Sequence, residues 1–197
     1  MRKAFMRQVK LLLIVLLGYL AQVTIMPYVK VGGVVPSMLI AVIAIITVGY
    51  GKLLALWVGA FYGIVMENML PTVKMMNLML YPVSALFCSV FFADKSASRL
   101  QYERSAGKAG RNISPLLRTI RCAAMNALIY EIVNVVYMYL GGTALTMAQV
   151  NKSLNGVFYT TLLTALLMLP VRKLLGFRKP KPENPVELRF GQRPERD

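Results

Sequence analysis

The sequence predicts an all-α integral membrane protein with six transmembrane helices and with both the N-terminus and the C-terminus in the cytoplasm. The first observation is composition: 57% of the 197 residues are hydrophobic, 16% are charged and the mean hydropathy is +0.57. This is too apolar for a soluble domain of this size. The second observation is that the apolar residues gather into six stretches, each a candidate membrane helix. The third is that the basic residues lie between these stretches, beyond them or near their ends.

The six predicted spans cover residues 11–29, 34–48, 53–70, 75–93, 116–140 and 154–175. The first span follows a basic N-terminal segment, residues 1–10. We expect it to be an uncleaved helix, because Tyr19 and Ala21 make a poor signal-peptidase site and more spans follow. Pro36 falls in the first turn of the second span, where a missing backbone N–H is harmless.

Charge sets the predicted orientation of these spans. The polar segment 94–115 is predicted to be a cytoplasmic loop, and residues 176–197, rich in proline and charge, a disordered basic tail. With six spans and both termini inside, the only basic residues outside the cytoplasm are Lys30, Lys74 and Lys152. The basic cytoplasmic surface is expected to meet anionic lipid. The net charge of +15 does not indicate nucleic-acid binding, since no basic domain stands apart from the spans.

The third predicted span carries a strip of small residues that ends in an acid. Ala55, Gly59, Gly63 and Glu67 recur every four residues and therefore share one helix face. Such a strip is a candidate surface for helix packing or for a partner, and internal packing is favoured over a dimer seam. Glu67 is expected near the external interface, where it caps the span or meets an external partner segment.

Glu131 is the most costly residue to bury, because it lies ten residues after Arg121, about 15 Å into the fifth span and near the bilayer midplane. An ionised acid there costs roughly 2.5–3.5 kcal/mol, so it needs a proton or a partner. Asn126, Tyr130 and Asn134 are expected to form a polar wedge with it on one side of the helix.

Three roles for the wedge remain open. Bonding to neighbouring helices is favoured; a proton or substrate site and contact with another protein's helix are the alternatives. The other intramembrane polar candidates are Gln22 in the first span and Asn155 in the sixth.

The residues do not predict an enzyme. Histidine is absent from the sequence, which removes the commonest general base and metal ligand. No nucleophile is paired with a base, and no glycine loop suits a phosphate. We therefore expect no catalytic residue, no metal site and no cofactor.

Five sequence features follow one another along the chain. They are Leu20, Gln22 and Pro27 ending the first span; the GGVVPS turn with Pro36; the Gly59 and Gly63 strip ending at Glu67; the pair Tyr130 and Glu131; and LNGV leading through Pro170 to VRKLL. In this order, and over nearly the whole chain, they resemble the rod shape-determining membrane protein family MreD.

The resemblance implies a non-enzymatic scaffold of the bacterial cell-elongation complex in the plasma membrane. Such a scaffold is involved in cell shape and in the regulation of peptidoglycan synthesis through the bitopic protein MreC. Through MreC it is associated with MreB, RodA and a class B penicillin-binding protein. The family is also similar in fold to the substrate-binding subunits of vitamin transporters. The alternative is therefore a subunit that binds a small, vitamin-like solute, with Gln22, Glu131, Asn134 and Asn155 lining a pocket.

Overall fold

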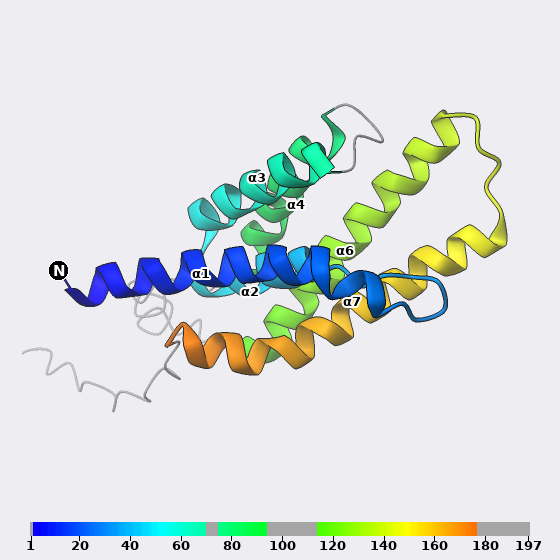
Figure 1. The fold of residues 1–197 in the computed structure, drawn as a ribbon. Helices are drawn as coiled ribbons and strands as arrows, with labels where there is room; N and C mark the ends of the chain where they lie inside the picture. Colours follow the sequence, from blue (N-terminus) through cyan, green and yellow to red (C-terminus); the bar gives the residue numbers. More distant parts are fainter. Residues whose placement is uncertain (1, 70–74, 94–113, 177–197) are drawn as a thin grey trace, which may run out of the picture.

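The computed structural model describes residues 2–69, 75–93 and 114–176, and within these ranges the regular structure is helical (Figure 1). The helices are α1 (Arg2–Thr24), the 3-10 turn η1 (Met26–Tyr28), α2 (Met38–Tyr50), α3 (Lys52–Met69), α4 (Met76–Phe92), α6 (Pro115–Leu140) and α7 (Met147–Leu174). The expected all-α fold is confirmed. Most of the expected loop 94–115 and nearly all of the expected tail 176–197 lie outside the described residues.

Within the described ranges, three segments are long and apolar enough to span a membrane by length and composition: Gln8–Tyr28, Pro115–Leu140 and Met147–Leu174. Two further apolar helices are shorter, with 13 residues in α2 and 17 in α4. At 1.5 Å per residue, α2 is about 20 Å long, against about 30 Å for the hydrocarbon core of a bilayer. Helix α2 is therefore shorter than the hydrocarbon core is thick. The expected second span, 34–48, is helical only from Met38 onward.

Helix α2 forms the centre of the bundle. All ten residues from Leu39 to Val48 are at most 2% exposed, and α1, α3, α4, α6 and α7 all pack against this helix. A helix that is apolar on every side is expected in the interior, because it has no polar face to turn toward water. The shortest of these apolar helices is therefore the one that the others enclose.

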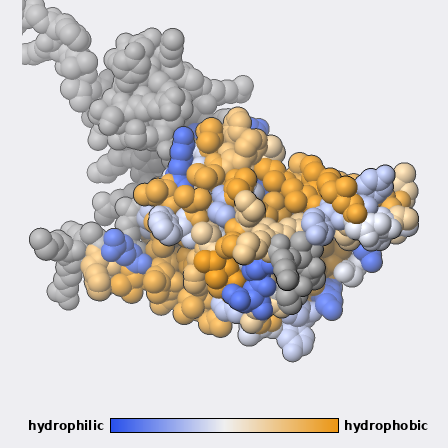
Figure 2. Space-filling view, turned by 90° about the horizontal axis from the view of Figure 1, so that it is seen from above, coloured by the Kyte–Doolittle hydropathy of each residue, from blue (hydrophilic) through white to orange (hydrophobic). Residues whose placement is uncertain are grey.

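The outer surface of the bundle is apolar. Large side chains such as Leu12, Trp57 and Leu166 are about two-thirds exposed, at 68%, 67% and 68%. Figure 2 shows broad hydrophobic areas over one face of the molecule, with smaller groups of hydrophilic residues between them. Contiguous apolar surface of this kind is unfavourable in water and suits contact with lipid or with other apolar helices.

Two helices begin earlier than the sequence predicted. Helix α1 begins at Arg2, within the basic segment 1–10. Helix α7 begins at Met147 and not at residue 154, so residues 147–153, which were expected to lie between the fifth and sixth spans, are helical. The backbone N–H of Thr146 donates to Oε1 of Gln149 at 3.1 Å, and this T-x-x-Q pattern is a known start signal for a helix.

Candidate functional site

The first site to consider is the N-terminus of α2, where Ser37 and Met38 are half-buried between α1 and α7. Three backbone N–H groups there are satisfied by side chains. Met38 donates to Oε1 of Gln22 from α1 at 2.5 Å, and Ser37 donates to Oγ1 of Thr160 from α7 at 3.0 Å. The hydroxyl of Ser37 accepts from Ile40 at 3.4 Å. Irregular backbone is tolerated at membrane depth only when such groups find partners in the protein.

Glu67 performs the same task for α4. Its carboxylate accepts hydrogen bonds from the N–H of Met75 at 2.5 Å and from the N–H of Asn77 at 3.1 Å. Met75 is the N-cap residue of α4, and its own side chain makes no capping bond. A carboxylate at a helix N-terminus is favourable because it meets free N–H groups and the positive end of the helix dipole. The carboxylate of Glu67, near the end of α3, therefore bonds the start of α4 in the same chain.

The strip on α3 also lies against α4. Ala55, Gly59 and Gly63 are buried. A Cβ added to Gly59 would lie 2.9 Å from Cα of Pro82, and one added to Gly63 would lie 2.8 Å from the carbonyl oxygen of Asn77. Both contacts are with the backbone of α4, so the glycines allow close approach of the two helices. A second protein could reach this face only by displacing α4.

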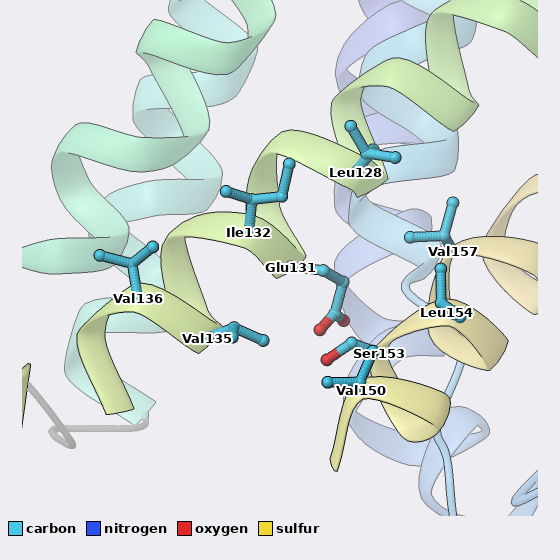
Figure 3. Close-up of a pocket in the computed structure, with 9 residues that line it drawn as sticks. All are labelled: Leu128, Glu131, Ile132, Val135, Val136, Val150, Ser153, Leu154 and Val157. Carbon is cyan, nitrogen blue, oxygen red and sulfur yellow. The ribbon is translucent and has the colours of Figure 1, made fainter. Parts of the chain in front are cut away.

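Glu131 lies between α6 and α7. Its Oε1 would be 3.1 Å from a Cβ added to Gly156 on α7, so the absent side chain of that glycine leaves room for the carboxylate. The hydroxyl of Ser153, also on α7, points toward the same carboxylate (Figure 3). Glu131 is half-buried, with one edge open to the outside of the bundle.

The open edge of Glu131 faces a cavity of about 220 Å³. Helices α6 and α7 pack together over part of their length and then diverge toward the loop that joins them (Figure 1). We call the cavity between the diverging segments the α6–α7 groove. Its lining residues are Leu128, Glu131, Ile132, Val135, Val136, Val150, Ser153, Leu154 and Val157 (Figure 3).

The structure does not gather the expected wedge residues around Glu131. The hydroxyl of Tyr130 faces α4, where it donates to Oδ1 of Asn77 at 3.5 Å, and its ring lies 5.3 Å from that of Tyr81. Asn134 is half-buried and is not among the groove-lining residues. Asn155 is exposed on α7. Tyr130 and Glu131 are adjacent in sequence, so they project from α6 in different directions.

Asn126 is the fully buried member of the expected wedge. Its side chain is 1% exposed, and neither its amide nitrogen nor its amide oxygen has a hydrogen-bond partner within the part of the chain that the structure describes. Burying an amide without partners is unfavourable, because its hydrogen bonds to water are lost and not replaced. Within the described residues, the amide of Asn126 therefore does not bond α6 to a neighbouring helix.

Sequence reasoning missed two residues that join helices. Tyr62 donates its hydroxyl to the carbonyl oxygen of Val15 on α1 at 2.8 Å, and Gly156 makes room for Glu131. Glycine and tyrosine are both common in membrane helices, so each is a weak signal alone. The i, i+3 spacing of Ser153 and Gly156 would have marked a shared helix face but not what it contacts.

No protein-family model, curated protein or solved structure matches this chain. In the part of the chain that the structure describes, the fold is all-helical and three helices are long and apolar enough to span a membrane. Within it, the α6–α7 groove with its single acid is the candidate site. In this groove the Glu131 carboxylate can accept a hydrogen bond in apolar surroundings, which suits recognition of a helix or of a small polar group.

Proposed function

We propose that this chain is a non-enzymatic membrane scaffold of the bacterial cell-elongation complex, as its resemblance to the MreD family implies. In this proposal it lies in the plasma membrane and crosses it six times with both ends in the cytoplasm. It associates there with an MreC-like bitopic protein, and indirectly with MreB, RodA and a class B penicillin-binding protein. Through these partners it is involved in cell shape and in the regulation of peptidoglycan synthesis.

One observation carries the proposal beyond the resemblance: polar side chains within the bundle hold helix ends. Gln22 and Thr160 bond the first turn of α2, and Glu67 bonds the first turn of α4. A solute-binding subunit needs several polar groups that converge on an empty pocket and remain free to bind the solute. Gln22, which would have lined such a pocket, is instead bonded to the backbone of Met38.

The size of the groove around Glu131 also supports a scaffold over a solute carrier. The larger cavity between α1 and α3, of about 350 Å³, is lined by leucine, valine, phenylalanine and tryptophan side chains and lacks the converging polar groups that a solute site needs. Pockets for drug-sized ligands have volumes of about 300–1,000 Å³ and enclose most of the ligand. The α6–α7 groove has about 220 Å³ and opens at the edge of the bundle. A vitamin-sized solute would project from it, whereas one or two side chains of a neighbouring helix would fill it.

The test is a pull-down from native membranes with an affinity tag on the full-length chain. We expect an MreC-like bitopic protein to be enriched relative to a tagged multi-pass protein of unrelated sequence expressed at the same level. The same preparation is analysed by mass spectrometry for small molecules. Recovery of a stoichiometric vitamin-like compound without an MreC-like protein would contradict the scaffold and favour the solute-binding subunit.

A further inference from the structure

Apolar side chains on both walls of the α6–α7 groove are half exposed or more. Ile132 and Val136 on α6 are 53% and 50% exposed, and Leu154 on α7 is 58% exposed. These three side chains line the cavity between α6 and α7 (Figure 3). The apolar surface here is concave and includes an acid, whereas another apolar cavity, of about 350 Å³ between α1 and α3, is lined without a charged residue.

The base of the groove holds a carboxylate whose one polar neighbour in the lining is the hydroxyl of Ser153. The lining contains Glu131, the hydroxyl of Ser153 and seven aliphatic side chains, so no lining residue is positively charged. An acid in such surroundings is stabilised by a hydrogen-bond donor or a cation brought from outside. A lipid acyl chain would fill the apolar walls but offers no donor to the carboxylate.

A second copy of this chain is a poor occupant for the same reason. A two-fold symmetric contact through this face would bring the same residues of both copies together. The two Glu131 carboxylates would then approach each other, and like charges in an apolar environment repel strongly. A different protein, which is free to carry a donor at that depth, avoids this conflict.

We propose that the α6–α7 groove binds one transmembrane helix of a partner protein, which places a hydrogen-bond-donating or cationic side chain against Glu131. The aliphatic side chains of Ile132, Val136 and Leu154 then pack on the apolar part of the partner helix. Ser153 and Gly156 hold the carboxylate in position for the donor. This inference rests on the proposed scaffold function, because it names the surface through which the bitopic partner binds.

Site-specific photo-crosslinking in intact cells tests the location. A photoreactive amino acid is introduced at Leu154 and, separately, at Ile132. The matched controls are Val83 and Val90, which are 58% and 60% exposed on α4 and lie away from the groove. We expect adducts at both groove positions that map by mass spectrometry to the transmembrane helix of the MreC-like protein, and weak or absent adducts at the control positions.

The outcomes separate the inference from the proposed function. Recovery of the MreC-like protein in the pull-down, with adducts only at the α4 positions, overturns the groove but leaves the scaffold standing. Adducts at Leu154 that contain a second copy of this chain, or only lipid, also overturn the groove. Failure of the pull-down itself contradicts the scaffold, and the groove assignment falls with it.

Substitution of Glu131 tests the chemistry of the contact. Glu131→Leu removes the acceptor for the donor on the partner helix. From the strength of hydrogen bonds between membrane helices, we expect the amount of copurified partner to fall about threefold to thirtyfold. The variant should remain folded, because an aliphatic side chain suits this lining better than an acid. Val83→Leu is the control and should copurify as the wild type does. Unchanged copurification of a folded Glu131→Leu variant would overturn the role of the carboxylate.

Discussion

Gly59 tests directly how closely α3 packs on α4. In Gly59→Ala, the new Cβ would lie 2.9 Å from both Cα of Pro82 and the carbonyl oxygen of Tyr81, and 3.1 Å from the backbone nitrogen of Pro82. Carbon atoms in favourable contact are separated by about 3.5–4.0 Å, so the helices must move apart by about half an ångström or more. The contacting atoms are backbone atoms and cannot rotate away.

The expected cost follows from two opposing effects. Overpacking a close contact costs typically about 1–3 kcal/mol, whereas alanine is favoured over glycine within a helix by roughly 0.5–1 kcal/mol. We therefore expect Gly59→Ala to lower the free energy of unfolding by about 1–2 kcal/mol. For a chain of this size that corresponds to a fall in melting temperature of about 2–8 °C.

The assay is unfolding in mixed micelles followed by tryptophan fluorescence. The chain has one tryptophan, Trp57, and it lies on α3, so the signal reports on the helix that carries the substitution. Gly141→Ala is the matched control, because its new Cβ would lie 3.4 Å from the nearest atom, which is ordinary contact. The control should stay within about 0.5 kcal/mol of the wild type.

A Gly59→Ala variant as stable as the wild type, or more stable, would refute the reasoning. It would mean that helix propensity outweighs the contact with Pro82 and that the two helices are less closely packed than the structure indicates. Loss of stability in Gly141→Ala equal to that in Gly59→Ala would also refute it, since the effect would then belong to any added methyl group.

Two further predictions concern buried polar side chains and use the same fluorescence assay. Gln22→Leu leaves the N–H of Met38 without its acceptor, and we expect a loss of about 1–3 kcal/mol, whereas Gln22→Glu retains an acceptor and should lose less. Equal stability of Gln22→Leu and wild type would exclude a structural role for that bond. Asn126→Leu replaces an unpaired amide by an aliphatic side chain with the same branching, so we expect a change between zero and a gain of about 1 kcal/mol. A marked loss of stability would show that the amide has a polar partner.

Much of the helical structure was predictable because hydropathy is a local property of the chain. The expected spans 75–93 and 116–140 differ by one residue at each end, or less, from α4 (Met76–Phe92) and α6 (Pro115–Leu140). The start of α7 was missed because residues 147–153 include polar side chains that suggested a loop. Their helical state depends on a cap at Thr146, which average hydropathy does not detect.

The candidate site was predictable only in part. Glu131 stood out because its cost depends on depth along the helix, which the sequence gives directly. Its neighbours did not stand out, because the register between α6 and α7 decides that Ser153 and Gly156 face it. The wedge was expected on one side of α6, whereas Tyr130 turns toward α4 and Glu131 toward α7.

By itself, the sequence determined that this chain is helical, where most helices lie, and that few polar groups enter the apolar stretches. Only the tertiary structure decided which of those groups meet. The N–H of Ser37 bonds a threonine 123 positions along the chain. Composition and periodicity describe neighbours within a few residues, but a bond of that kind depends on how separate helices are placed in space. The same reason explains why α2, the shortest apolar helix, lies at the centre and why Glu131 lies at the base of an open groove.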